Sequence, residues 1–194
     1  MRTRHAFVVL IAATLVCNFG IATGADALVS GPQAGSKLPG VFQPLPLNVT
    51  NAERPTYAGK RNDYIEQFGA DPVVLVFGRK ITDPLSSLIK KLDAEVGKNK
   101  AARLRAVVVM LSDDDELERK LRELGERQGI EKVSLAIMPD GPKHYKLSQE
   151  ADVTVILYQR FKVEANHAFR KGELNDKATE KILADALKLV SDKR

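Results

Sequence analysis

The side chains of this chain that could carry covalent or redox chemistry are few. Cys17 is the single cysteine among 194 residues, which excludes an intramolecular disulfide, a CxxC redox pair and a cysteine-rich zinc site. The hydroxyl groups of Ser86 and Ser87 could act as nucleophiles only with a general base within hydrogen-bond reach, and the candidates are His144 and His167. We expect instead that both serines cap a helix and that both histidines lie in solvent. The sequence therefore predicts no catalytic residue, no bound cofactor and no metal ligand.

Two charged segments are better explained by a helix end and a solvated surface than by a ligand. Residues 112–116 read Ser-Asp-Asp-Asp-Glu and lack the spaced ligands and the glycine of an EF-hand loop. Acidic residues favour the positive end of a helix dipole, so this cluster predicts a helix start. The basic stretch of residues 98–105 has no interleaved aromatic residues, and a net charge of +5 is a mild bias, so no nucleic acid partner is expected.

The first 27 residues are typical of a secretory signal peptide. Arg2 and Arg4 precede an apolar run from Ala6 to Val16, and small residues ending at Ala27 follow it. The run is shorter than the ~20 apolar residues of a membrane span, although an uncleaved anchor and a lipid on Cys17 remain alternatives. Cleavage near Ala27 would release an exported protein, periplasmic or secreted, with no cysteine and no stable membrane anchor.

The remainder divides into an extended segment, residues 28–60, and a regular domain, residues 61–194. The first is rich in Gly, Pro, Ser and Asn, and we call it the N-terminal strap. Asp83 is expected to cap the second helix of the domain, with Pro84 at its first helical position. Strands are expected at residues 73–77, 106–111, 133–138, 153–158 and 162–169, and helices at 61–68, 83–97, 112–129 and 176–191. The last helix is expected to bury Ile182, Leu183, Ala186, Leu187 and Val190.

The order of these elements is β-α-β-α-β followed by β-β-α, which predicts an α/β domain. Because crossovers between parallel strands are right-handed, the first three strands should lie parallel in one sheet. The C-terminal hairpin should add an antiparallel edge, and helices should cover both faces. Tyr145 and Leu147 are expected to anchor a loop on the core.

Three stretches give the chain a resemblance to a known fold family. They are GPQAGSKLPG at residues 31–40, VVLVFGRKITDPL at residues 73–85 and DVTVILYQRFKVEA at residues 152–165. In this order they resemble the thioredoxin fold, and the additional strand at residues 133–138 makes the redoxin and peroxiredoxin branch the nearest likeness. The resemblance implies a thioredoxin-like three-layer α/β/α sandwich, in which a mixed sheet has parallel central strands and an antiparallel C-terminal hairpin.

The positions that hold redox cysteines in the resembled family hold other residues here. The first cysteine of a thioredoxin follows the strand-ending aromatic by five positions, so Thr82–Leu85 stands where C-x-P-C would stand. A peroxiredoxin-style alignment places the reactive cysteine at Leu85 or Ser86. The position of the family's cis-proline falls on Val153, before Thr154, and a trans bond is expected there because a cis bond without proline costs about 3 kcal/mol. The resemblance therefore implies the shape of a redoxin without its redox chemistry.

These observations predict a non-catalytic binding or scaffold protein. In the resembled family a groove beside the cysteine holds an extended peptide, so residues 82–85 with Val153 and Thr154 would rim a vestigial groove for a peptide or protein partner. In the simpler interpretation these residues only cap and pack. The alternative function is a thioredoxin- or peroxiredoxin-type oxidoreductase whose nucleophile is unrecognised or supplied by a partner.

Overall fold

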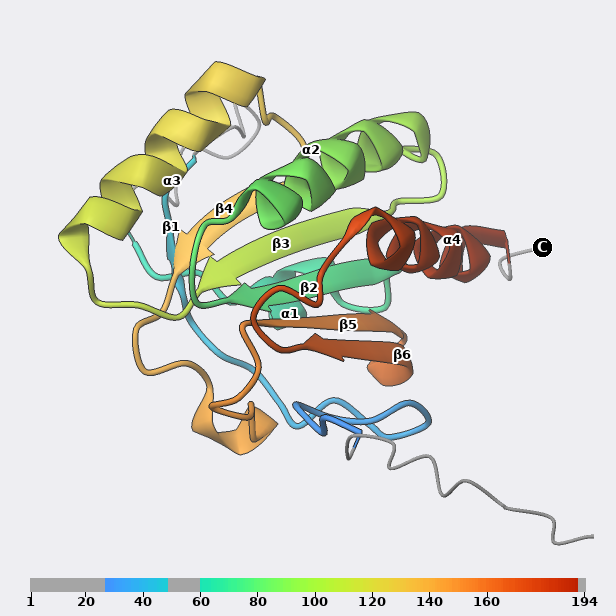
Figure 1. Ribbon diagram of the computed structural model, residues 1–194. Coiled ribbons are helices and arrows are strands. Elements are labelled where there is room, and N and C mark those ends of the chain that lie inside the picture. The colour runs from blue at the N-terminus through green and yellow to red at the C-terminus, as the bar shows by residue number, and fades with distance from the viewer. Residues whose placement is uncertain (1–26, 49–59, 192–194) are drawn as a thin grey trace, which may run out of the picture.

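The computed structural model of the protein describes residues 27–48 and 60–191 (Figure 1). The expected signal peptide and Cys17 lie outside the described residues, apart from Ala27. The described chain forms one six-stranded sheet in the order β1-β4-β3-β2-β5-β6. Its strands are β1 (Leu45–Pro46), β2 (Val73–Gly78), β3 (Arg105–Met110), β4 (Ser134–Ile137), β5 (Val153–Gln159) and β6 (Lys162–Phe169).

Each helix expected in residues 61–191 is present. The helices are α1 (Tyr64–Phe68), α2 (Asp83–Lys98), α3 (Asp115–Gln128) and α4 (Asp176–Ser191), with a short 3-10 helix, η2 (Lys143–Tyr145), between β4 and β5. α1 is shorter than expected because Asp63 caps it by accepting hydrogen bonds from two backbone N–H groups. α3 ends at Gly129, whose left-handed backbone conformation (φ +62°) suits a glycine. No helix among the described residues is long and apolar enough to cross a membrane.

The pairing of the strands confirms the expected topology. β2 pairs in parallel with β3, and β3 pairs in parallel with β4. β5 lies antiparallel to β2 on the other side, and β6 completes a hairpin with β5. The hairpin turn places Arg160 and Phe161 at positive φ, the backbone conformation of a tight two-residue turn. The two-residue strand β1, which pairs antiparallel with β4, was not expected.

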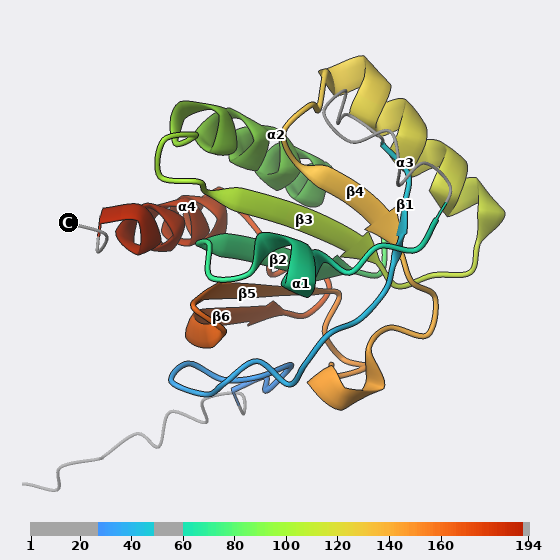
Figure 2. The same cartoon turned by 180° about the vertical axis from the view of Figure 1, so that it is seen from behind.

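The sheet separates two hydrophobic clusters and so forms the middle of three layers. α2, α3 and α4 all lie on one face, in front of the sheet in Figure 1. They share this face because the chain moves in one direction from β2 to β3 to β4, and right-handed crossovers then place both connecting helices on the same side. The other face is covered by α1, by the strap and by the loop around Tyr145, as Figure 2 shows from behind.

Two local expectations about α2 and α4 were wrong. The N-cap of α2 is Thr82, whose hydroxyl accepts a hydrogen bond from the backbone N–H of Leu85, so Asp83 lies inside the first turn. In α4, Leu187 is 41% exposed and Leu189 is buried instead. The helical spacing explains this difference, because Leu189 lies three residues after Ala186 on the stripe that faces the sheet.

The described part of the strap crosses the second face from one sheet edge to the other. Residues 35–38 pair with the start of β6 through backbone hydrogen bonds, including Gly35 N–H to the Val163 carbonyl at 2.8 Å. The strap then runs past Tyr145, whose hydroxyl donates a hydrogen bond to the Gly40 carbonyl. Tyr145 is 1% exposed and Leu147 packs against the same cluster, which confirms that this loop is anchored on the core.

Candidate functional site

The first turn of α2 holds the positions at which the resemblance places redox cysteines. The side chain of Thr82 is exposed, and so are those of Asp83 and Pro84. The Thr82 hydroxyl accepts from Leu85 N–H at 3.4 Å, and the Ser86 hydroxyl donates to the Thr82 carbonyl at 2.9 Å. The expectation that Ser86 caps the helix was therefore wrong, because its hydroxyl bonds within the first turn. Both hydroxyls are engaged by the backbone of the turn that carries them.

Leu85 is a core residue. Its side chain is fully buried, and it belongs to the cluster beneath α2, α3 and α4. A Cβ atom on Gly78 would lie only 3.0 Å from Leu85 Cδ2 and 3.1 Å from Met110 Sδ, so the glycine leaves room for both side chains. The position that would hold a cysteine of the C-x-P-C motif is thus occupied by a residue that fixes α2 on the sheet.

Val153 and Thr154 lie on opposite faces of the sheet. Val153 pairs with Gly78 and joins the cluster that contains Leu85, whereas Thr154 pairs with Phe77, a residue of the other cluster. Both residues are nearly fully buried, at 4% and 2% exposed. All peptide bonds among the described residues are trans, as expected before and after Val153.

Part of the strap covers Thr154. The buried Ser30 places its hydroxyl 2.7 Å from the Thr154 hydroxyl, and the Ser30 hydroxyl also accepts from Ser148 N–H. The structure therefore brings Leu85 and Val153 together in one cluster, and separates Thr154 from them beneath the strap. Of the predicted groove, the side chains exposed to a partner are those of Thr82, Asp83 and Pro84.

The two histidines of the described chain have different surroundings. His144 is exposed, and its ring lies edge-on against Tyr145. His167 was expected in solvent, but its side chain is 12% exposed because α4 covers that face of β6, and its Nε2 lies 3.0 Å from Asp185 Oδ2. Burial lowers the pKa of His167, and the ammonium group of Lys181 lowers it further.

Asp185 is the anionic partner in this cluster on α4. Its carboxylate also forms ion pairs with Lys181 at 2.9 Å and Lys188 at 2.6 Å. Burial opposes ionisation, but the hydrogen bonds from these two ammonium groups hold the pKa of Asp185 at about 2. The cluster fastens α4 to β6. Among the described residues no group of three or more potential ligands could hold a metal ion.

A polar cavity of about 460 Å³ lies at the edge where the parallel strands end. Arg79 directly follows β2, Leu111 directly follows β3 and Pro139 comes shortly after β4, so residues after all three parallel strands line it. Lys143 and Lys146 line it from η2 and its C-terminal end. In open α/β sheets, ligands bind at this edge of the strands.

Arg79 is the functional candidate that the sequence analysis missed. Its Nε donates to the Ala151 carbonyl at 3.0 Å, and its Nη2 donates to the Ser148 carbonyl at 3.1 Å. The available signal was a basic residue placed immediately after a buried strand, together with two lysines in the polar loop after β4. That signal does not show that the side chains of Arg79, Lys143 and Lys146 line one cavity.

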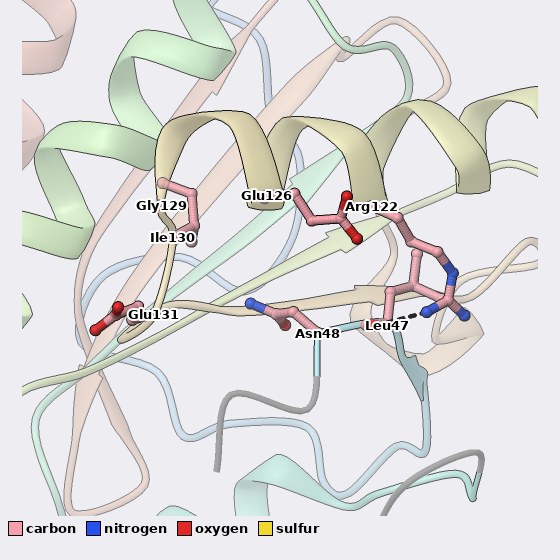
Figure 3. A pocket seen from close by; sticks show the side chains of 8 residues that line it. Leu47, Asn48, Arg122, Glu126, Gly129, Ile130 and Glu131 are labelled. Carbon is pink, nitrogen blue, oxygen red and sulfur yellow. Dashed lines mark hydrogen bonds between the residues drawn. The ribbon is translucent and has the colours of Figure 1, made fainter. Parts of the chain in front are cut away.

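A second hollow, of about 370 Å³, lies between α3 and the end of β1 (Figure 3). Arg122 reaches across it from α3 and donates a hydrogen bond to the Leu47 carbonyl at 2.7 Å. The Asn48 side chain donates a hydrogen bond to the Val133 carbonyl, just before β4, and accepts one from Leu135 N–H in β4. These polar groups anchor the strap to the domain. Its lining includes Asn48, the last described residue before residues 49–59, and we assign the hollow no ligand.

Comparison with known proteins identifies the fold. No family model matches the chain, and no curated protein matches it in sequence. A solved structure from Chlorobium tepidum, assigned as a thiol:disulfide interchange protein DsbE, is similar with a TM-score of 0.58 and 18% identity, over 84% of this chain and 99% of that one. The peroxidoxin BcpB of Mycobacterium tuberculosis gives a TM-score of 0.57 and 15% identity over 85% and 97%. A secreted disulfide oxidoreductase of the same organism, homologous to DsbE of E. coli, gives 0.52 and 13% over 74% and 95%.

The chain therefore has the thioredoxin-like fold of the redoxin and peroxiredoxin type. The six-stranded mixed sheet, its parallel centre and its antiparallel hairpin match that fold, as the sequence predicted. After Cys17 the sequence contains no cysteine, so Thr82 and Leu85, where the resemblance places the redox cysteines, carry none.

Proposed function

We propose that this protein is an exported, non-catalytic binding protein built on the redoxin scaffold. The observation that carries the proposal is the state of the two motif positions. Thr82 serves as the helix cap, and Leu85 is a fully buried residue of the core. A redox cysteine must be reachable and must form a thiolate, whereas a threonine hydroxyl at a helix N-terminus does not ionise near neutral pH.

The hydroxyl groups of this turn also lack the arrangement of a serine nucleophile. A nucleophilic serine needs a general base within hydrogen-bond reach. The Ser86 hydroxyl instead donates to a backbone carbonyl, and Ser86 is 9% exposed. His167 is hydrogen-bonded to Asp185 on α4, and the ring of His144 lies against Tyr145. These contacts favour binding over catalysis at this edge.

We place the binding surface at the C-terminal edge of the parallel strands. It consists of the exposed residues Thr82, Asp83 and Pro84 and, at the same edge, the cavity lined by Arg79. Backbone N–H groups at the start of the 16-residue helix α2 favour carbonyl or anionic groups of a partner. A peptide or protein partner fits this surface, and the buried Val153 and Thr154 would support the surface from below without touching the partner.

Export is part of the proposal because residues 1–27 combine a basic start, an apolar run and small residues before Ala27. The similar structure from M. tuberculosis is described as that of a secreted protein. Cell fractionation followed by N-terminal sequencing of the recovered protein tests export directly. A mature chain that begins near Leu28 supports it, and an intact leader in the cytoplasmic fraction contradicts it.

The test of the non-catalytic role is a redox assay on the full-length protein. Wild type and Cys17→Ser should reduce insulin with dithiothreitol, and consume hydrogen peroxide, no faster than buffer. Turnover above buffer that survives Cys17→Ser would favour an enzyme with an unrecognised nucleophile. Turnover that arises only when an envelope extract is added, and exceeds that of the extract alone, would favour a nucleophile supplied by a partner.

A further inference from the structure

We propose that the cavity at the C-terminal edge of β2, β3 and β4 binds an oxyanion, a carboxylate or phosphate group carried by a small organic molecule. Arg79 is the residue that anchors it, and Lys143 and Lys146 add positive charge. The inference rests on the proposed binding function and adds a small-molecule site to the surface proposed for a partner.

The guanidinium of Arg79 is fixed in place but is not neutralised. Its two hydrogen bonds go to the carbonyl oxygens of Ala151 and Ser148, which belong to the segment before β5. Among the described residues no carboxylate pairs with it. Arg79 is half-buried, and an ionised group taken out of water is costly unless an opposite charge accompanies it. An arginine has five N–H donors in a rigid fork, so donors remain for a ligand after these two bonds.

Lys143 and Lys146 bring two more positive charges to the same cavity from one short helix. Both side chains are exposed, and neither forms an ion pair within the described chain. Lys146 has a left-handed backbone (φ +53°) because it caps the C-terminal end of η2. Asp140 is the one acidic residue of the lining, so three cations face one carboxylate.

Cations in two other parts of the described surface are paired with carboxylates. On α3 the cations Arg119, Lys120 and Arg122 each form an ion pair with a glutamate of the same helix. Arg103 and Arg105 share the buried carboxylate of Asp71. These positive side chains are neutralised locally, whereas those of the cavity leave a surplus for an anion.

The size and the lining define the class of ligand. A volume of about 460 Å³ lies within the range of small-molecule sites, roughly 300–1,000 Å³. The planar fork of an arginine matches the geometry of carboxylate and phosphate groups. Leu111 and Leu147 lie in the same lining and offer apolar contact to a carbon skeleton. A small organic carboxylate or phosphate ester satisfies both parts of the cavity.

Isothermal titration of the full-length protein tests the proposal with three probes: succinate, glycerol phosphate and the uncharged succinamide. Saturable binding of succinate or glycerol phosphate that weakens as sodium chloride is raised supports an anion site, and the probe that binds more tightly assigns carboxylate or phosphate. Succinamide should show no saturable heat. Equal binding of succinamide, or no saturation by either anion, overturns the proposal.

Two pairs of substitutions locate the site. Lys143→Gln with Lys146→Gln removes two charge contacts and should weaken binding about tenfold, which is about 1.4 kcal/mol for the two together. Lys171→Gln with Lys177→Gln, which removes two exposed cations elsewhere, should leave affinity unchanged. Equal loss in the two double variants would show unspecific attraction and overturn the site. The redox assay tests the non-catalytic role and the titrations test the anion site, so a failure of one proposal can be distinguished from a failure of the other.

Arg79→Lys separates the geometry of the fork from its charge. The variant keeps one positive charge but loses the planar donors, so anion binding should weaken more than tenfold while the circular dichroism and the urea midpoint stay near those of wild type. Unchanged affinity in a folded Arg79→Lys variant would exclude Arg79 as the anchor. If this variant unfolds, the lysine pairs above still decide whether the cavity binds the anion.

Discussion

Replacing Thr82 by cysteine should create a reactive thiol, because the position is exposed at the N-terminus of a 16-residue helix. The Thr82 hydroxyl lies 3.4 Å from the N–H of Leu85, so a sulfur atom there would lie about 4 Å from the positive end of the helix. A half charge at that distance contributes about 1 kcal/mol at an effective dielectric constant of about 40. At neutral pH this energy raises the thiolate fraction about fivefold.

The expected gain in reactivity is smaller than the gain in thiolate. A thiolate with a lower pKa is a weaker nucleophile, with a Brønsted coefficient of about 0.4–0.5, so alkylation near pH 7 should accelerate about threefold relative to the same chain unfolded in urea. The long cap bond means that the fold should lose about 1 kcal/mol or less when the threonine is removed. The variant should therefore remain folded during the assay.

The assay is the rate of iodoacetamide alkylation as a function of pH, in a Cys17→Ser background, for the folded and the urea-unfolded chain. Ser191→Cys is the matched control, because Ser191 is exposed at the C-terminal end of a helix of the same length, the 16-residue α4. There the helix dipole should slow alkylation instead of accelerating it. If Thr82→Cys reacts no faster when folded than when unfolded, α2 does not activate a nucleophile at this position, and the comparison with a redox site fails.

Three further predictions concern the surroundings of the site. Gly78→Ala should lower the free energy of unfolding by about 1–3 kcal/mol, because the added methyl group would lie 3.0 Å from a buried leucine of α2, and an unchanged urea midpoint would contradict this. Ser30→Ala should cost about 1–3 kcal/mol because it leaves the buried Thr154 hydroxyl without its partner, whereas the exposed Ser36→Ala control should cost little in the same urea titration. Because burial lowers the pKa of His167 below the value of 6.5 expected when unfolded, the unfolded chain binds more protons below that pH. The contribution of the neutral, buried His167 to stability is complete above about pH 6.5 and is lost as the pH falls further. Urea midpoints should therefore decrease from about pH 7.5 to pH 5, and they should decrease less in His167→Asn.

The fold was predictable because its strands and helices carry strong local signals. The continuous apolar run of β2 indicated a strand buried on both faces, and all six of its residues are buried. The bounds of α4 follow from its apolar spacing and agree with the expected residues 176–191. β1 carried no such signal, because its two residues include Pro46 and the strand exists only through its pairing with β4.

The site was less predictable because its contacts join distant parts of the chain. Arg79 donates to a carbonyl 72 positions away in sequence, and Ser30 binds a hydroxyl 124 positions away. His167 of the C-terminal hairpin was expected in solvent, but the docking of α4 places Asp185 over it. Thr82 and Asp83 are both good helix caps, and only the path of the loop before α2 decides between them.

The edge of the sheet where the parallel strands end could serve binding as well as redox chemistry. The ends of β2, β3 and β4 and the N-terminus of α2 meet there whatever residues they carry, because right-handed crossovers bring them to one side. A cysteine in the first turn would use the helix dipole to form a thiolate. In this chain Leu85 uses that turn for packing, and Arg79, in the loop before the helix, lines a cavity at the same edge of the sheet. Positive potential that activates a nucleophile in a redoxin would here attract an anion, so the scaffold would retain its electrostatics while its use changes from reaction to binding.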